Sequence, residues 1–340
     1  MPLPLVITAN AAVGKRWASL AIGLLGGLVA GATFLLGALD FAGAPILAAG
    51  LTQQQRYGLD IGTMATGFVA AALVSQPVRA RLARVIPIDP ENPVHALALV
   101  LAVILFGTQI ITIAFTDVLA ADQKQPPLTL TDLIVQEVPF LILAGAGVGI
   151  FMRRQLSEAA TRLGLVRPAW WHLAFALAAA GLFFGFSQGM DYASQALTPD
   201  LARRVQTVTD HVFGQLNNPV GIAALALVPG ICEEILFRGA LQPRIGLIAT
   251  ALLFTSIHTE YGFSVAALAI FVIALGLGLI RKYANTTSSC LTHATYNLLA
   301  GIGIGGSYLA VAVMIEAVLV GVAAYGIWRS RRAVAAAVVP

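Results

Sequence analysis

Long apolar runs, broken by short polar segments, dominate the chain. An α-helix needs about 20 apolar residues to cross roughly 30 Å of hydrocarbon, so each long run is a candidate span. The runs are continuous, whereas the strands of a membrane barrel alternate apolar and polar positions over about ten residues. We therefore predict an all-α, polytopic helical membrane protein with about ten transmembrane helices. The predicted spans are Trp17–Ala38, Ile61–Val78, Val94–Thr116, Leu133–Met152, Trp170–Gly189, Val220–Gln242, Ile245–His258, Phe263–Ile280, Ser288–Ile304 and Tyr308–Trp328.

Two of the polar segments carry a helical pattern of their own. Between Leu201 and Leu216 the apolar residues recur at helical spacing, which predicts an amphipathic helix lying on the outer membrane interface. The segment Arg153–Arg167 is similar and more basic, which indicates a second such helix on the cytoplasmic side.

The composition supports a membrane protein and excludes other classes. Hydrophobic residues make up 58% of the chain and charged residues only 11%, against about 25% charged in soluble domains. This leaves too few charged side chains to coat a soluble fold, and the apolar content excludes a disordered chain. Two cysteines are too few for a disulfide-rich secreted scaffold.

The small net charge of +4 hides a strong asymmetry. With the N-terminus placed inside, sixteen of the twenty Lys and Arg residues fall on the cytoplasmic side, and Arg56, Lys124, Arg203 and Arg204 fall outside. This bias follows the positive-inside rule, so we expect both termini in the cytoplasm. The Ala- and Arg-rich composition favours a bacterial cytoplasmic membrane.

Ionisable side chains inside a membrane cost several kcal/mol unless they are paired or hydrated, so each marks a candidate site. The first four predicted spans hold Glu137 near one end, with Asp132 just outside it. Glu316, midway along the last span, is expected to be protonated rather than catalytic. The sixth to ninth spans hold most of the others, which are Glu233, Glu234, Arg238, His258 and His293, together with the polar Asn297.

These polar side chains agree in depth. From the turn at residues 242–244, Glu233 lies roughly 15 Å and His258 roughly 20 Å into the membrane, at about 1.5 Å per residue. From the start of the ninth span, His293 lies roughly 10 Å and Asn297 roughly 15 Å deep. Three helices thus bring a carboxylate, two imidazoles and a carboxamide to one band in the cytoplasmic half. These groups can activate a water and stabilise an oxyanion.

The spacing assigns roles to individual side chains. Glu234 and Arg238 are four residues apart on one helix face, which predicts an ion pair. Buried pairs of this kind commonly hold helices together, so both residues are expected to support the site structurally. Glu233 points about 100° away, which leaves one carboxylate free to face a cavity. His293 and Asn297 are also four residues apart and can address one point.

Three short motifs follow one another on successive apolar segments. They are E-E-x-x-x-R at Glu233–Arg238, F-x-x-x-H at Phe254–His258 and H-x-x-x-N at His293–Asn297. Together they resemble the motifs of the CAAX-processing and bacteriocin-processing intramembrane proteases, also called the type II CAAX prenyl endopeptidase or Abi family. The resemblance covers about Val220–Asn297 and does not explain the first 130 residues. The first three spans are poor in buried polar groups, which places a boundary near Pro126-Pro127. We therefore predict an N-terminal helical extension of about three spans (1–130) and a CAAX-protease-like catalytic domain (131–330), with its motif core at 220–297.

The resemblance implies an intramembrane endopeptidase that hydrolyses a peptide bond near the cytoplasmic face with a glutamate-activated water. Glu233 would be the general base, and His258 would help to hold the water. His293 and Asn297 would support the substrate carbonyl and its developing oxyanion. The partners implied are membrane lipid and a peptide or membrane-anchored protein substrate, with no nucleic acid and no required cofactor.

Other interpretations stay open. Glu233, His258 and His293 could supply the three ligands of a catalytic zinc site, with water as the fourth. The H-E-x-x-H spacing is absent, and no further carboxylate adjoins either histidine, so zinc is less favoured. A non-catalytic immunity or assembly partner that retains the protease scaffold is the alternative function. A proton-coupled transporter fits less well, because no inverted repeat is visible.

Overall fold

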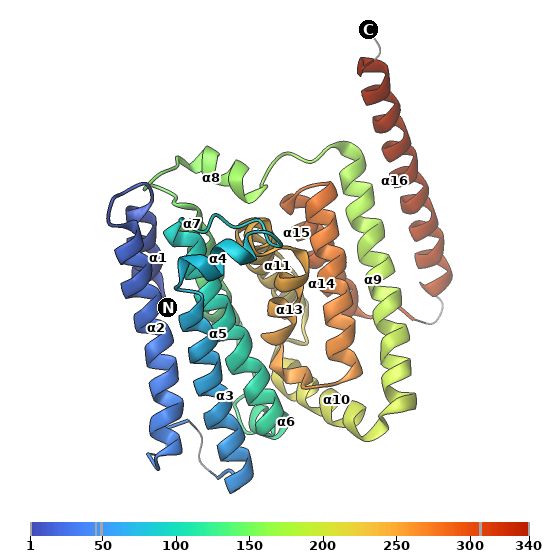
Figure 1. The fold of residues 1–340 in the computed structure, drawn as a ribbon. Coiled ribbons are helices and arrows are strands. Elements are labelled where there is room, and N and C mark those ends of the chain that lie inside the picture. The colour runs from blue at the N-terminus through green and yellow to red at the C-terminus, as the bar shows by residue number, and fades with distance from the viewer. Residues whose placement is uncertain (1, 45, 48–49, 306–307, 339–340) are drawn as a thin grey trace.

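Figure 1 shows the computed structural model of residues 1–340. The structure describes every residue except 1, 45, 48–49, 306–307 and 339–340. For residues 333–338 it describes the backbone and not the side chains. The described part of the chain is helical and contains no β-strand; an isolated β-bridge joins Ile150 and Arg154. The all-α class predicted from the apolar runs is therefore confirmed.

The described residues before position 130 form six helices. The long ones are α2 (Ala18–Phe41), α3 (Gln53–Ala72) and α5 (Pro93–Phe115), and the short ones are α1 (Leu3–Ala12), α4 (Gln76–Leu82) and α6 (Val118–Asp122). At the start of α5, the Asn92 side chain accepts from the amides of Val94 and His95, as an N-cap residue does.

The remaining helices carry the predicted motifs. In chain order they are α7 (Leu130–Val148), α8 (Leu156–Leu163), α9 (Trp170–Leu197), α10 (Pro199–Phe213), the 3₁₀ turn η1 (Gly214–Leu216), α11 (Pro219–Glu234), the π-helix η2 (Ile235–Leu241), α12 (Gln242–Ile245), α13 (Leu247–Ser256), the 3₁₀ turn η3 (Thr259–Tyr261), α14 (Val265–Tyr283), α15 (Thr286–Ile302) and α16 (Leu309–Val338). The two amphipathic segments predicted between spans are the helices α8 and α10.

Seven of the ten predicted spans are helices long and apolar enough to cross a membrane, namely α2, α5, α7, α9, the continuous segment Pro219–Ile245, α14 and α16. The protein is therefore an integral membrane protein. The predicted second span is the pair α3 and α4, which is bent by 88° at the break between them and would make an eighth span if the pair crosses together.

The other two predicted spans fall short of a full crossing. α13 has ten residues, because Gly246 leaves the helical conformation at its start and the helix ends at Ser256. Ten residues rise only about 15 Å, half the hydrocarbon thickness. α15 has 17 residues and is interrupted by polar side chains. The count of about ten spans is thus not confirmed.

The N-terminal helices bury more acidic side chains than the apolar runs indicated. α2 and α3 extend further than predicted and take in Asp40 and Asp60, which are 2% and 0% exposed. Asp40 Oδ1 accepts from the backbone amides of Ile46 and Leu47. The expectation that the first spans hold few ionisable groups was therefore wrong at these two positions.

The cationic segments lie toward two opposite ends of the bundle. Figure 1 shows α1, α8 and the C-terminal part of α16 toward one end, and α6 and α10 toward the other. The first group of segments includes Arg162 of α8 and Arg329, Arg331 and Arg332 of α16, and Arg203 and Arg204 belong to α10. The cations of α8 and α16 thus lie toward the end of the bundle opposite to those of α10.

The largest apolar core joins the N-terminal helices to the motif segment. Leu99 and Val100 of α5 pack in one buried cluster with Phe237 of η2, Leu253 and Phe254 of α13. The predicted boundary near residue 130 therefore divides the sequence but does not separate two cores.

Candidate active site

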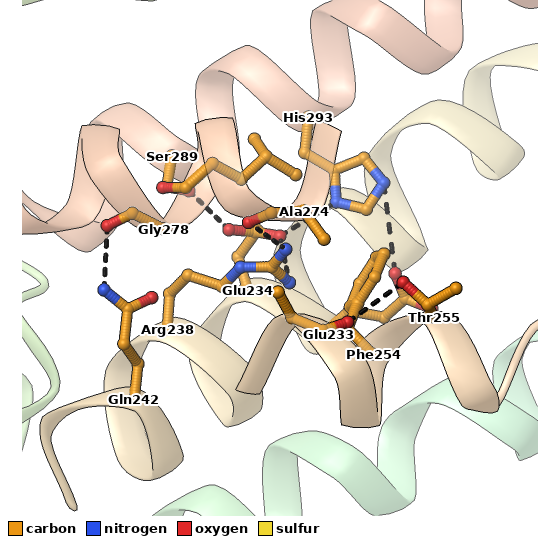
Figure 2. A network of polar contacts seen from close by, with 12 residues as sticks. Glu233, Glu234, Arg238, Gln242, Phe254, Thr255, Ala274, Gly278, Ser289 and His293 are labelled. Atoms are coloured by element: carbon orange, nitrogen blue, oxygen red, sulfur yellow. Dashed lines mark hydrogen bonds and ion pairs between the residues drawn. The ribbon is translucent and has the colours of Figure 1, made fainter. Parts of the chain in front are cut away.

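Glu234 is the centre of a buried polar network (Figure 2). Its Oε1 lies 2.9 Å from Arg238 Nη1 and 3.1 Å from His293 Nδ1. Ser289 Oγ donates to the other carboxylate oxygen. Because the Glu234 side chain is fully buried, these partners replace the hydration that its charge has lost. The ion pair predicted from the spacing of Glu234 and Arg238 is present, and both oxygens of Glu234 are engaged.

Arg238 is held by more than its ion pair. The Nη1 contact with Glu234 is an ion pair rather than an aligned hydrogen bond. Nη2 donates to the Ala274 carbonyl at 3.4 Å, and the guanidinium lies 4.1 Å from the centroid of the Phe254 ring, within the range of a cation–π interaction. The charge pattern counted Arg238 among the cytoplasmic cations, but its side chain is 1% exposed and lies inside the protein.

Glu233 differs from its neighbour in having a free oxygen. It is 5% exposed, and its Oε2 has no hydrogen-bond partner among the described residues. His293 Nε2 lies 3.9 Å from this oxygen (Figure 2), which is too long for a direct hydrogen bond. A buried carboxylate oxygen without a partner is costly, so Glu233 is the natural candidate for chemistry.

His258 presents one ring nitrogen for chemistry. Its Nδ1 lies 2.9 Å from the carbonyl oxygen of Phe254, and since a carbonyl only accepts, Nδ1 carries the hydrogen. In the neutral ring, Nε2 is then the basic nitrogen. The Phe254 ring contacts both imidazoles, with centroids 4.8 Å from His258 and 5.9 Å from His293. One aromatic side chain thus sets the positions of the two histidines.

Asn297 is tied to the helix that carries the glutamates. Its Nδ2 donates to the Leu225 carbonyl at 3.2 Å. Within the described residues no hydrogen bond joins Asn297 to the other motif side chains. The structure therefore brings Glu233, Glu234 and His293 into one network, places His258 beside them through Phe254, and attaches Asn297 to α11.

The register between α11 and α15 comes from a close backbone approach. A Cβ on Gly230 would lie 2.8 Å from Ala294 N and 2.9 Å from Ala294 Cα, a separation that real Cβ atoms do not adopt. Only glycine permits this contact. It sets the turn that carries Glu233 and Glu234 against His293.

A π-helix begins directly after the two glutamates. η2 covers Ile235–Leu241 and carries Arg238, and such segments are rare and frequently found at functional sites. Near its end, Gln242 Nε2 donates to the Gly278 carbonyl at 2.7 Å (Figure 2). This bond ties the widened turn to α14.

The described residues contain no group of three His, Cys, Asp or Glu side chains placed to hold one metal ion. Glu233, His258 and His293 thus do not form a ready ligand set, and we derive no step through a metal.

Two residues of this region were not singled out for the site from the sequence. Ser289 lies one helical turn before His293 on the same face of α15, so its spacing was a usable signal. Glu137 of α7 is 8% exposed with one oxygen lacking a partner among the described residues, and its charge acts on Glu233. No spacing in the sequence places Glu137 of α7 beside Glu233 of α11.

Glu260 lies outside the spans in η3, next to the motif histidine His258. Burial raises the pKa of the Glu260 carboxyl, and the nearby charge of Asp122 acts in the same direction, while that of His258 acts in the opposite one.

One comparison with known proteins gives a match. No curated protein and no solved structure matches the chain. Residues 215–299 match the family model described as type II CAAX prenyl endopeptidase Rce1-like. The matched segment runs from η1 into α15 and contains all three motifs. The resemblance drawn from those motifs is therefore confirmed: residues 215–299 are similar to the type II CAAX prenyl endopeptidase Rce1-like family, which is a family of proteases.

Proposed function

We propose that the protein is an intramembrane endopeptidase that hydrolyses a peptide bond with a water activated by Glu233. The observation that carries this proposal is the difference between two adjacent glutamates. Glu234 is bound by Arg238, His293 and Ser289, whereas Glu233 keeps a buried oxygen without a partner among the described residues. A carboxylate with a free oxygen can take a proton from water. The family match of residues 215–299 supports a peptidase.

In the proposed reaction, Glu233 takes a proton from a bound water as the water oxygen attacks the scissile carbonyl carbon. The carboxyl then gives this proton to the leaving nitrogen as the C–N bond breaks. His258 orients the water, because its Nδ1 is committed to the Phe254 carbonyl and its Nε2 can accept a hydrogen bond. The products are a new carboxylate and a new amine.

His293 and Asn297 are proposed to stabilise the oxyanion. The Nδ1 of His293 faces Glu234, so its Nε2 is the nitrogen on the side of Glu233. In the proposed step the ring is the doubly protonated imidazolium, because only then can Nε2 donate to the oxyanion while Nδ1 donates to Glu234. Asn297 uses one amide hydrogen on the Leu225 carbonyl and keeps a second for the substrate. Donors held in place before the reaction contribute most when charge develops on the oxygen.

The proposed side of cleavage is cytoplasmic. α15 begins at Thr286, after the basic end of α14, and His293 lies about 10 Å further along the helix. By the positive-inside rule, we place this end of the protein and both termini in the cytoplasm. The membrane we propose is a bacterial cytoplasmic membrane. The proposed substrate is a peptide or membrane-anchored protein whose scissile bond reaches this depth.

The test uses purified protein in detergent and a membrane-anchored peptide substrate. Glu233→Gln should lower the cleavage rate by roughly 10²–10⁴-fold, the usual contribution of a general base, with little change in thermal stability. Glu91→Gln, which changes an exposed loop carboxylate, should cleave at the rate of the unmodified protein. Full cleavage by Glu233→Gln would overturn the mechanism. Rescue of a deletion phenotype by that variant would instead favour the non-catalytic partner.

A further inference from the structure

A large cavity lies away from the glutamates, between the N-terminal helices and the motif segment. Its volume is about 780 Å³, within the range of sites for small molecules. One wall comes from α5, with Leu101 and Leu105, and the other from α7, η2 and α13, with Leu143, Leu236 and Leu253. None of the six motif residues assigned to the active site lines it.

The cavity is apolar inside and cationic at one end. Arg153, Arg154, Arg162 and Arg244 all line it, and Asp89 is the carboxylate that also contributes. No salt bridge joins any acid to these four arginines in the described part of the chain. Three of the four are half-buried, where water screens their mutual repulsion less than at an open surface.

Two of these arginines have protein partners and two do not. Arg153 donates to Asn10 Oδ1 at 2.5 Å and 3.0 Å, and Arg154 donates to the Val148 carbonyl. Arg162 and Arg244 make no side-chain hydrogen bond among the described residues. Burial, together with the positive charges of Arg244, Arg154 and Arg281, lowers the pKa of the Arg162 guanidinium to about 10. A cluster of this kind is completed by an anion.

We propose that this cavity binds an anionic phospholipid, with its phosphate on the arginine cluster and an acyl chain along the Leu101 and Leu105 wall. Arginine is suited to phosphate because its planar fork of N–H donors matches the phosphate oxygens. The apolar interior selects an acyl chain rather than a peptide, because a peptide backbone would need hydrogen-bond partners that leucine side chains do not offer.

The proposed ligand has a structural consequence. Its two parts touch helices on both sides of the predicted boundary near residue 130, since α5 precedes it and η2, α12 and α13 follow it. An occupied cavity would therefore brace the N-terminal helices against the segment that carries the glutamates. Binding to the folded protein alone raises its stability.

The test measures lipid binding to the full chain in a zwitterionic detergent by native mass spectrometry and by the shift in Tm. Phosphatidylglycerol should bind and raise Tm, while phosphatidylcholine with the same acyl chains should do neither. Glycerol phosphate and an apolar peptide with a free C-terminal carboxylate serve as the other probes. Equal binding of the two lipids would overturn the proposal. Glycerol phosphate binding as tightly as phosphatidylglycerol would also overturn it, in favour of a soluble anion, and tighter binding of the peptide would do so in favour of a peptide site.

Variants distinguish lipid binding in the cavity from a general effect of surface charge on lipid binding. Arg162→Gln with Arg244→Gln should weaken phosphatidylglycerol binding by roughly thirtyfold, at about fivefold for each basic residue. The matched control is Arg81→Gln with Arg84→Gln, which removes two exposed cations that do not line the cavity, and it should change binding less than twofold. Equal loss in both double variants would overturn the proposal. Ala98→Phe keeps every charge and narrows the cavity, so it should weaken binding by roughly tenfold, which preserves a test if the arginine variant does not fold.

Discussion

The Asn297 side chain donates its hydrogen bond to the Leu225 carbonyl, which is the carbonyl that Pro229 leaves without a donor in α11. In an α-helix the amide of residue 229 would bond to the carbonyl of residue 225, but proline has no N–H. Asn297 therefore repairs a gap in the helix that carries the glutamates. The motif asparagine is a positioning residue in this structure, whatever it also offers to a substrate.

This pairing predicts a result for a double-mutant cycle. Asn297→Leu should destabilise the protein by about 0.5–1.5 kcal/mol, because the part-buried Leu225 carbonyl loses its side-chain donor. In a Pro229→Ala background the helix supplies its own N–H, so the same substitution should cost clearly less. Thermal unfolding of the four proteins measures this difference. Equal costs in both backgrounds would show that the bond to Leu225 contributes nothing.

The same four proteins separate two roles of Asn297. If Asn297 also donates to the oxyanion, Asn297→Leu should lower the cleavage rate in the Pro229→Ala background even where stability is recovered. Recovery of both stability and cleavage would confine the residue to its structural role.

The ion pair of Glu234 and Arg238 predicts a strong asymmetry between single and double variants. Glu234→Gln leaves the buried Arg238 charge uncompensated, and breaking such a pair typically costs about 3–5 kcal/mol. Replacing both residues, as in Glu234→Gln with Arg238→Met, should cost less than the sum of the single changes. Glu233→Gln is the matched control, because it changes the adjacent carboxylate whose Oε2 has no partner among the described residues. Additive losses of Tm would contradict a coupled pair.

The sequence predicted those features that depend on local runs and spacing. The seven full-length spans follow from continuous apolar stretches, and the amphipathic helix α10 from its apolar stripe. The contact between Glu234 and Arg238 follows from their spacing on one helix. These features require no knowledge of how the helices pack.

The features that were missed depend on packing between helices. An apolar run does not reveal that Gly246 breaks the helix before α13. The bonds of Ser289 and Asn297 exist because Gly230 admits α15 so closely to α11. Asp40 and Asp60 sit at the ends of apolar runs, and only the observed extension of α2 and α3 shows that they are buried.

Cleavage is expected to be independent of a bound metal. The described residues contain no group of three His, Cys, Asp or Glu side chains placed to hold one metal ion, so Glu233, His258 and His293 do not form a ready three-ligand site. Treatment with a chelator followed by metal analysis of the purified protein should leave the cleavage rate unchanged. Loss of cleavage that zinc restores, with one zinc bound per chain, would establish the zinc alternative.

Glu260 predicts a pH-dependent stability. Burial raises the pKa of its carboxyl in the folded protein, so the folded state keeps a proton that the unfolded chain has already released. Stability contributed by this group is therefore present below its ordinary pKa and is lost as pH rises through the raised value. Glu260→Gln removes the charge, so its Tm should exceed that of the unmodified protein by a few degrees at pH 8 and match it at pH 4.

The prediction must be separated from the effect of His258, whose nearby charge opposes the rise in the pKa of Glu260. The Glu260→Gln comparison is therefore repeated in a His258→Gln background, where the gain at pH 8 should persist because burial is the main cause. Glu91→Gln, an exposed carboxyl, should show no difference in Tm at either pH. A gain in Tm that is the same at pH 4 and pH 8 would mean that Glu260 acts through packing rather than through its charge.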